Sequence, residues 1–333
     1  MTQLGNYVPA LQEPGELGVH SLDHFGLIVP DLSKAEYFYK SFGIDVRAEN
    51  ERISLYTAGQ THQWARITEG SRKKFEYLSF GAFEEDFLRF GKRLDRLGIR
   101  RLPPPSADLD SGGFWFRDPD GTMVEIKVCA KSSPAKKTEF RTVSSPPNIR
   151  GAISRSEAQV IRPQRLAHVL FFTSDVARTI DFYRGVVGLR LSDRSSDDVA
   201  FMHGIHGSDH HMVAFAKSVA PGFHHCSWTV PTQDEIGRGA MQMAECGFSS
   251  GWGLGRHVIG SNYFHYVRDP WGSYSEYSCD IDYIAADKLW ECKDYPAEDR
   301  SYLWGAQRPA DFGFNYEAAP QEEEGVGYSI SPR

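Results

Sequence analysis

Two histidines and one glutamate in the second half of the sequence have residue types suited to binding a metal ion. They are His168, His225 and Glu276, and each lies in a stretch that we expect to form a strand. Two neutral imidazoles and a carboxylate, presented by three different strands, would hold a divalent ion from one side and leave coordination positions open on the other. Such an arrangement suits an Fe(II) ion that binds a chelating substrate and dioxygen together, whereas a structural zinc site closes all its positions.

The elements that carry these residues belong to an internal repeat. Residues 22–40 (LDHFGLIVPDLSKAEYFYK) align with residues 166–184 (LAHVLFFTSDVARTIDFYR), and each segment predicts a strand followed by a helix. Both copies end alike, because residues 114–125 (FWFRDPDGTMVE) and 266–276 (YVRDPWGSYSE) share an Arg-Asp-Pro-x-Gly turn between two predicted strands. The chain is therefore predicted to be a duplicated domain in which strands and helices are mixed.

The repeat also provides an internal control for the metal site. His24 and Glu125 in the first copy correspond to His168 and Glu276 in the second. On the third strand, however, the first copy has Tyr77 where the second copy has a histidine. A site that needs two imidazoles and a carboxylate is complete only in the second copy, so the first copy is predicted to be a scaffold without metal.

Composition shifts along the chain predict five regions. The scaffold domain is expected at 20–130 and the catalytic domain at 166–285, separated by a linker at 131–165 that is rich in Ser, Pro and charged residues. Residues 286–317 form a C-terminal extension dense in aromatic side chains, which we expect to pack on the second domain because so much aromatic surface needs covering. Residues 318–333 are expected to be a flexible tail.

The overall composition excludes several classes of protein. The 333 residues are 41% hydrophobic and carry a formal net charge of −7, which argues for a globular protein and against nucleic acid as a partner. We find no apolar stretch long enough to span a membrane, and residues 1–20 lack the apolar segment of a secretory signal. The five cysteines form no CxxC pair. These features predict a cytoplasmic protein with no membrane partner.

The sequence around Glu276 resembles that of a known family. GRH at 255–257, followed after seven residues by HYVRDPWGSYSE at 265–276, closely resembles the signature of the type I extradiol ring-cleavage dioxygenases. These catechol dioxygenases belong to the vicinal oxygen chelate superfamily and include the homoprotocatechuate and dihydroxybiphenyl dioxygenases. His265 departs from the pattern, since the family usually has an aliphatic residue or Phe there. The resemblance covers both copies, about residues 20–285.

The resemblance implies a fold and a metal. The fold would be α+β, with two tandem domains that each contain two βαβββ modules forming a partly open, curled sheet. The metal would be Fe(II), bound by His168, His225 and Glu276, and the same ligands would also hold Mn(II). His224 precedes a ligand on the strand and should point to the opposite face, and it is the rival of His225 for the second ligand position.

Three further residues acquire roles from the resemblance. By this resemblance, His211 is similar to the family's acid/base histidine. An imidazole suits that role because it titrates near neutrality and can take and return a catechol proton. His210 is its rival, since a shift of one residue would exchange the two. His257 and Tyr266 resemble the pair that hydrogen-bonds the substrate oxygens.

Candidate substrate contacts follow from strand alternation. Leu170 and Ile259 lie two positions beyond His168 and His257, so each should share the face of the site. His203 could face the acid/base histidine across a hairpin and would then place a polar group in the pocket. We expect all three to contact the substrate.

The sequence thus predicts an Fe(II)-dependent extradiol dioxygenase that cleaves a substituted catechol in aromatic compound degradation and inserts both atoms of O2. The family implies a homo-oligomer whose partners are a small aromatic diol and O2. One alternative is a ring-cleaving hydroquinone dioxygenase that uses the same metal triad. Another is a metal-free small-molecule-binding protein of the same superfamily, although the presence of the ligands counts against it.

Overall fold

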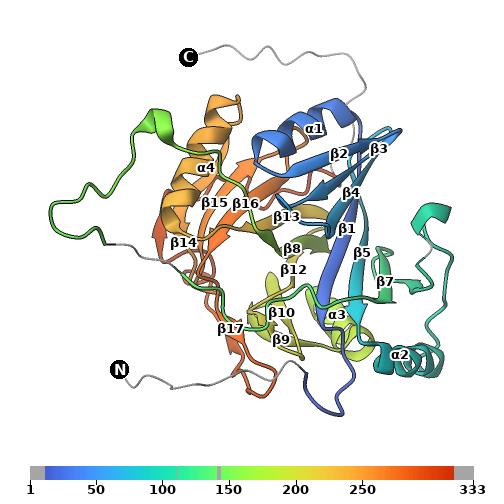
Figure 1. The fold of residues 1–333 in the computed structure, drawn as a ribbon. Coiled ribbons are helices and arrows are strands. Elements are labelled where there is room, and N and C mark those ends of the chain that lie inside the picture. The colour runs from blue at the N-terminus through green and yellow to red at the C-terminus, as the bar shows by residue number, and fades with distance from the viewer. Residues whose placement is uncertain (1–11, 110, 141–143, 319–333) are drawn as a thin grey trace.

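The computed structural model describes residues 12–109, 111–140 and 144–318 (Figure 1). Two sheets, one per sequence copy, lie next to each other and carry their helices on the outside. The expected tail, 318–333, lies outside the described residues apart from Ala318. None of the helices in the described parts of the chain is long and apolar enough to cross a membrane.

The first copy forms a seven-stranded sheet and two helices. Its strands are β1 (Ser21–Val29), β2 (Asp45–Glu49), β3 (Arg52–Tyr56), β4 (Gln63–Glu69), β5 (Lys74–Ala82), β6 (Phe114–Arg117) and β7 (Met123–Val128). Its helices are α1 (Leu32–Ser41) and α2 (Glu84–Arg96). The strand order β2-β3-β4-β1-β5-β7-β6 places the first strands of the two modules, β1 and β5, side by side in the middle.

The second copy forms a ten-stranded sheet. Its strands are β8 (Arg165–Thr173), β9 (Leu189–Ser195), β10 (Val199–Gly204), β12 (Val213–Lys217), β13 (Gly222–Thr229), β14 (Gly251–Arg256), β15 (Tyr263–Arg268), β16 (Tyr274–Cys279), β18 (Lys293–Asp294) and β19 (Trp304–Gly305). Its helices are α3 (Val176–Phe182) and α4 (Gln233–Glu245), and a small separate sheet pairs β11 (Ser208–Asp209) with β17 (Tyr283–Ile284).

The two sheets share one topology, which confirms the α+β fold of two tandem, curled sheets. The order β9-β10-β12-β8-β13-β16-β15 repeats that of the first copy, with β14 added after β15. One module departs from the expected βαβββ pattern. Between α2 and β6 the described residues contain only an isolated bridge from Leu102 to Trp115 in place of a strand.

Apolar contacts hold the two copies together. The rings of Phe42 and Tyr277 stack with centroids 3.8 Å apart, and the Tyr277 hydroxyl donates to the carbonyl of Phe42 over 2.9 Å. Phe25 and Phe223 stack at 5.5 Å. As a result α1 of the first copy lies beside α4 of the second (Figure 1). Stacked aromatic pairs of this kind add to the free energy gained from burying their area.

The C-terminal extension pairs with both edges of the second sheet. β18 is parallel to β9 at one edge, and β19 is antiparallel to β14 at the other. Some aromatic side chains of the extension pack inward, including Tyr302 and Phe312. Others do not, since Trp304 is 42% exposed and Phe314 is 50% exposed, so the expectation that the extension would cover its aromatic surface holds only in part.

The end of the extension joins the two copies through one carboxylate. Glu317 accepts the backbone N–H of Phe75 in β5 and that of Phe223 in β13, each over 2.9 Å. Each donor is the second residue of its strand, and the two strands belong to different sheets. A single side chain therefore satisfies two backbone groups that belong to different domains.

Replacing Glu317 is expected to destabilise this junction. Glu317→Ala leaves two partly buried backbone donors without acceptors and should lower the free energy of unfolding by about 1–3 kcal/mol. Denaturant unfolding followed by fluorescence would measure the change. Glu298→Ala removes an exposed carboxylate of the same extension and should leave the midpoint unchanged, and equal midpoints for the two variants would contradict the junction.

Candidate metal centre

Three side-chain atoms converge in the interior of the second sheet. Nε2 of His168 lies 3.2 Å from Nε2 of His225 and 3.3 Å from Oε2 of Glu276, while the last two atoms are 3.9 Å apart. All three side chains are buried. The structure thus brings together the three residues that the sequence suggested as metal ligands.

Strand register explains why these side chains meet. His168 in β8 and Glu276 in β16 both pair with Ser227 of β13, which runs between them. Residues paired across neighbouring strands point to the same face, and so do residues two apart on one strand. His225 therefore joins the other two on one face, and the small Ser227 turns its hydroxyl to Ser278 over 2.8 Å.

The distances among the three atoms fit a metal ion. Two ligands at right angles, each about 2.1 Å from an ion, lie about 3 Å apart. Oε2 of Glu276 is also buried without a hydrogen bond from any described residue, a state that is costly for a charged oxygen. A divalent cation would satisfy this oxygen and both imidazole nitrogens at once.

The charges around this group already favour the form that binds metal. Burial alone would raise the pKa of Glu276, but His168, His257 and His225 outweigh it and hold the pKa well below its usual range. Burial lowers the pKa of His225 well below its ordinary value, with His224 as a further cause. An ionised carboxylate and a neutral imidazole are the protonation states that metals require.

His224 departs from the orientation expected for it. The pairing of β13 with β8 skips from Phe223 to His225, so His224 is the extra residue of a β-bulge. A bulge breaks strand alternation locally. His224 therefore lines the same cavity as His225 and does not point to the opposite face.

The contacts of His224 fix the hydrogen positions on its neighbour. Its Nε2 lies 2.7 Å from the carbonyl oxygen of Phe312, which can only accept. Burial lowers the pKa of His224 to about 4, so the ring is neutral and its Nδ1 must accept. The donor across the 2.6 Å contact is then Nδ1 of His225, which leaves Nε2 of His225 with a lone pair toward His168 and Glu276.

His257 and Tyr266 form a pair beside Glu276. Nε2 of His257 lies 2.9 Å from the Tyr266 hydroxyl and 3.8 Å from Oε1 of Glu276. Nδ1 of His257 donates to the carbonyl of Ser301 in the C-terminal extension over 2.5 Å. Asn262 donates to the same Glu276 oxygen over 3.1 Å, so a second neighbour orients the carboxylate.

His211 lies beside His168. Its ring centroid is 4.1 Å from that of His168, and the side chain is 3% exposed. Burial lowers the pKa of His211 well below its ordinary value, and the nearby His168 adds to the effect. Its neighbour His210 does not line the cavity, so the structure favours His211 over His210 as the residue that faces the site.

A cavity of about 310 Å³ opens from the convergent group toward the surface. Leu170 and Ile259 line it. Leu170 lies two positions beyond His168 on β8, as expected, whereas Ile259 lies in a turn after β14 and not on a strand. The walls of the cavity are mainly apolar and aromatic, and the cations Lys217, Arg300 and Arg308 also belong to its lining. This volume is at the lower end for small-molecule sites.

The expected position of His203 is wrong. Strand pairing places Phe201 opposite Ala214, and the Phe201 ring lies 4.9 Å from that of His211 and lines the cavity. The pairing of β10 with β9 is irregular between Phe201 and Met202, and the extra residue is Ser192 of β9. His203 is buried outside the cavity lining, with Nδ1 2.7 Å from the Ser192 hydroxyl.

Sequence reasoning missed several residues of the site. Asn262, Phe201, Ser301 and Phe312 contact the candidate site residues, and two of them come from the C-terminal extension. The density of aromatic residues marked the extension as a packed segment. No local pattern, however, signals that its backbone carbonyls reach two site histidines.

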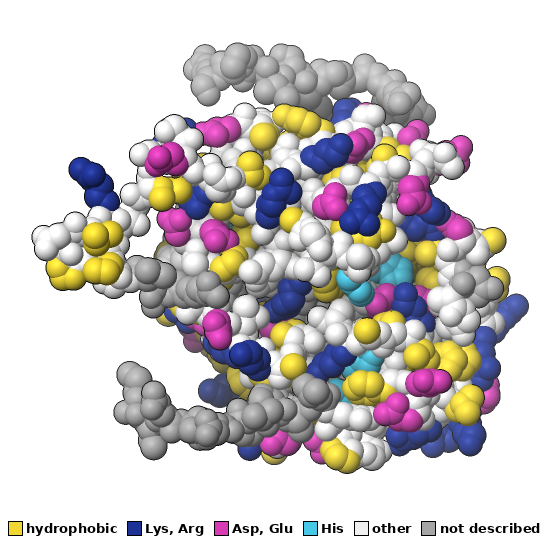
Figure 2. Space-filling view, in the orientation of Figure 1, with side chains coloured by type: hydrophobic (Ala, Val, Ile, Leu, Met, Phe, Trp, Pro, Cys, Tyr) yellow, Lys and Arg dark blue, Asp and Glu magenta, His cyan; other side chains and the backbone are white. Residues whose placement is uncertain are grey.

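The first copy shows what replaces the metal site when the second histidine is absent. The rings of His24 and Tyr77 lie 5.3 Å apart at 80°, much as those of His168 and His225 lie 5.3 Å apart at 77°. Figure 2 shows histidine side chains in a hollow, in the region where Figure 1 places the first-copy strands. The strand frame is therefore shared, and only the side chains differ.

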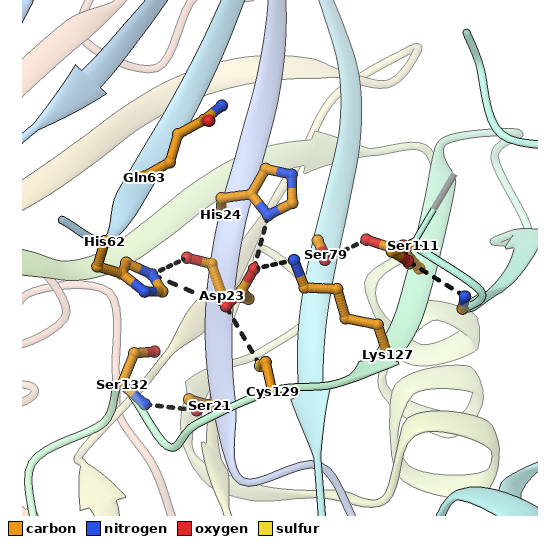
Figure 3. Close-up of polar contacts among 12 residues, drawn as sticks. Ser21, Asp23, His24, His62, Gln63, Ser79, Ser111, Lys127, Cys129 and Ser132 are labelled. Atoms are coloured by element: carbon orange, nitrogen blue, oxygen red, sulfur yellow. Dashed lines mark hydrogen bonds and ion pairs between the residues drawn. The ribbon is translucent and has the colours of Figure 1, made fainter. Parts of the chain in front are cut away.

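Lys127 and Asp23 supply an internal ion pair at this position (Figure 3). Asp23 accepts from Lys127 Nζ over 2.7 Å and lies 2.8 Å from Nδ1 of His24. Both oxygens of Glu125 accept serine hydroxyls, from Ser79 and Ser111. Burial opposes the ionisation of Asp23, but His24 and Lys127 hold its pKa well below the usual range. The carboxylates are satisfied by the protein itself, which is consistent with a scaffold domain.

Comparison with known proteins identifies the class. The model of the Glyoxalase/Bleomycin resistance protein/Dioxygenase superfamily matches residues 21–126 and 165–277. Among solved structures, an Mn(II)-bound glyoxalase from Novosphingobium aromaticivorans has a TM-score of 0.71 at 20% identity, covering 94% of this chain and 98% of that one. A variant of homoprotocatechuate 2,3-dioxygenase from Brevibacterium fuscum also gives 0.71 at 19% identity, covering 91% and 84%.

A closer relative narrows the class to a family. Metapyrocatechase 2 of Cupriavidus necator is 50% identical over 300 residues, which cover 90% of this chain and 93% of that protein. The chain belongs to the extradiol ring-cleavage dioxygenases of the vicinal oxygen chelate superfamily.

Buried histidines away from the convergent group predict how stability depends on pH. Burial lowers the pKa of His20 to about 4 and that of His203 to about 3, against 6.5 for an exposed imidazole. The unfolded chain then binds more protons than the native state below about pH 6.5. The free energy of unfolding should fall as the pH drops from 6.5 toward 4, by up to about 1.4 kcal/mol per pH unit for each group.

Denaturant unfolding of the metal-free protein between pH 7 and pH 4.5 would measure this slope. In His203→Asn the amide oxygen or nitrogen can still contact Ser192, but one titrating group is gone. The variant should therefore show a shallower slope. An unchanged slope would contradict the assignment of His203 as a buried neutral ring.

Proposed function

We propose that this chain is an Fe(II)-dependent extradiol dioxygenase that cleaves a substituted catechol and inserts both atoms of O2. The observation that carries the proposal is the convergence of His168 Nε2, His225 Nε2 and Glu276 Oε2 at metal-ligand spacing beside a cavity. Membership of the family and 50% identity to a metapyrocatechase support the reaction. The choice of iron over manganese is the more specific part of the proposal, because relatives include a manganese-dependent enzyme.

These three residues would hold the ion from one side. When bound, Fe(II) supplies adjacent positions for both catechol oxygens and for dioxygen, and allows electrons to pass between them. The rest of the chemistry falls to the protein, which must orient the ring, exclude water and manage protons. Mn(II) would fit the same donors.

His211 is the proposed base. Its ring touches His168 and lines the cavity. A catechol hydroxyl bound next to the ligands would therefore lie within reach of His211. Because burial keeps the imidazole neutral, it is ready to accept a proton when the substrate arrives. The same nitrogen can later return that proton to the product.

His257 and Tyr266 are proposed to stabilise negative charge on the substrate oxygens. Since the Ser301 carbonyl accepts from Nδ1, the tautomer of His257 with its hydrogen on Nδ1 accepts the Tyr266 hydroxyl at Nε2. The Tyr266 hydroxyl can then donate into the cavity when it turns toward the substrate. Donors placed in this way in a dry site favour charge that develops during the reaction.

The cavity walls are proposed to sandwich an aromatic ring. Leu170 and Ile259 contribute aliphatic surface, while Phe201 and Trp252 contribute aromatic faces. The volume of about 310 Å³ suits a single ring with a small substituent. The position of the cleaved bond depends on how this ring is turned.

The domain plan and the setting of the protein are part of the proposal. We assign 20–130 to the scaffold domain and 166–285 to the catalytic domain, with the linker at 131–165 and the extension at 286–317. The five cysteines, all within the described residues, are free thiols, as suits a cytoplasmic protein. A homo-oligomer is proposed from the family.

The reaction can be tested with metal-loaded protein. Anaerobic protein reconstituted with Fe(II), mixed with a panel of catechols and then exposed to air, should consume one O2 per catechol and form a yellow ring-opened product. Oxygen uptake and absorbance would be recorded together. Uptake only with hydroquinones would shift the assignment to a hydroquinone dioxygenase. No uptake with any diol despite bound metal would overturn the dioxygenase.

Variants separate the proposed ligand from its neighbours. His225→Ala should abolish tight binding of Co(II), measured by titration of the metal-free protein. His224→Leu removes the acceptor that fixes the His225 tautomer and should weaken binding by about 10–100-fold. His224→Asn keeps an oxygen near the position of Nδ1 and should bind Co(II) more tightly than the Leu variant.

Activity then distinguishes the base from the ligands. His211→Ala should keep metal affinity and lower kcat by about 100- to 10,000-fold, because it removes proton transfer and leaves the donors in place. Retention of tight Co(II) binding by His225→Ala would refute its assignment as a ligand.

A further inference from the structure

Three buried side chains form a row that runs outward from the cavity. Nδ1 of His211 lies 3.1 Å from Nδ1 of His210, and Nε2 of His210 lies 2.8 Å from Oδ2 of Asp193. His210 is fully buried, and Asp193 and His211 are 2% and 3% exposed. Resting on the proposed function of His211, we propose that Asp193 and His210 are positioning residues that fix which nitrogen of His211 carries its hydrogen.

The carboxylate of Asp193, at the outer end of the row, sets which atom donates in each hydrogen bond. A carboxylate can only accept, so Nε2 of His210 carries a hydrogen toward Asp193. In this tautomer Nδ1 of His210 is an acceptor, and the hydrogen between the two Nδ1 atoms belongs to His211. Nε2 of His211 is left as a lone pair. His211 lines the cavity and His210 does not, so this acceptor belongs to the ring that the substrate meets.

The outer end of the row is held by the C-terminal extension. Oδ1 of Asp193 accepts the backbone N–H of Lys293 over 2.7 Å, and Lys293 is paired with Asp193 across β18 and β9. His210 is anchored through its own backbone, since its N–H donates to the backbone carbonyl of Asp282 over 2.6 Å. Both oxygens of Asp193 thus have assigned donors, and its carboxylate cannot turn without breaking one of them.

The first copy again provides a control. With His24 aligned to His168, the strand registers place Gln63, His62 and Arg47 at the positions of His211, His210 and Asp193. There Nε2 of His62 lies 2.9 Å from the backbone carbonyl oxygen of Asp23 and 3.8 Å from Oδ1 of the same residue (Figure 3).

Among the residues that the structure describes, the row of His211, His210 and Asp193 therefore occurs only in the copy that has the convergent ligand group. The consequence for the reaction is direct: a base must present a lone pair to the hydroxyl that it deprotonates. The opposite tautomer of His211 would present an N–H to the catechol and could not accept its proton.

The isosteric variant Asp193→Asn reverses the row. The Lys293 N–H still needs an acceptor, so the amide oxygen stays there and the amide NH2 faces Nε2 of His210. That nitrogen must then accept, so Nδ1 of His210 donates to His211, and Nε2–H of His211 points inward. Replacing this carboxylate by an amide thus inverts the tautomers of both histidines without changing any residue that lines the cavity.

Kinetics of iron-loaded Asp193→Asn would test this inversion. With catechol, kcat should fall at least about 100-fold while KM and iron content stay near those of the wild type. With 4-nitrocatechol, which is already ionised near neutral pH because its nitro group withdraws electrons, the loss should be below about fivefold. Asp294→Asn, which alters a neighbouring exposed carboxylate on β18, should keep the wild-type kcat for both substrates. Equal losses with both substrates would overturn the proposal, and so would an unchanged kcat.

A spectroscopic readout separates this proposal from the dioxygenase assignment. Nitrogen-15 NMR of the histidine rings in the metal-free full chain reports which ring nitrogen is protonated, with His211 assigned by the loss of its signals in His211→Gln. The signal should change from an Nδ1–H to an Nε2–H tautomer in Asp193→Asn, whether or not any diol is cleaved. An unchanged tautomer would overturn the positioning role.

A second variant covers the case in which Asp193→Asn is too unstable to study. His210→Phe keeps the ring volume but cuts the row, so both tautomers of His211 should appear and kcat with catechol should fall. Adding Asp193→Asn to His210→Phe should then cause no further loss of kcat. A further loss of tenfold or more would show that Asp193 acts by another route and would overturn the proposal.

Discussion

The buried charge of Glu276 is the constraint on which the second domain depends. A carboxylate in the interior of a sheet is costly unless partners compensate for its lost hydration. Asn262 satisfies one oxygen, and the imidazoles of His168 and His225 face the other. The three central strands must keep a register that brings Ser227 level with His168 and Glu276, because a slip of one residue would turn one ligand to the other face.

Around this group the C-terminal extension sets the hydrogen positions. It pairs with both edges of the second sheet, so it crosses the cavity region with its backbone fixed at each end. Its carbonyls at Ser301 and Phe312 and its N–H at Lys293 each meet one polar side chain, namely His257, His224 and Asp193 respectively. Backbone groups are reliable for this purpose, since a carbonyl only accepts and an amide N–H only donates. The extension therefore acts on the site through polarity as well as by covering it.

Duplication shows how little separates a metal site from a scaffold. Both copies share strand order, and the ring pairs at His24–Tyr77 and His168–His225 have nearly the same spacing and angle. In the first copy Lys127 and the serine hydroxyls neutralise or satisfy the carboxylates from within the chain. In the second copy an oxygen of Glu276 is left for a cation. The same frame supports either outcome, since each depends on a few side chains.

The sequence by itself determined the repeat, the strands and helices, and the three convergent residues, because periodicity and turn residues are local signals. Leu170 also followed from alternation within β8, whereas Ile259 reaches the cavity from a turn after β14. The orientation of His224 was decided by irregular strand pairing, which depends on the neighbouring strand and leaves no mark in the segment itself. The position of His203, beside Ser192 and outside the cavity lining, also came only from the folded structure. The choice between His210 and His211, and the roles of Asp193, Ser301 and Phe312, likewise came from tertiary structure. Their contacts join residues far apart in the chain, and only the folded backbone brings such donors and acceptors within reach.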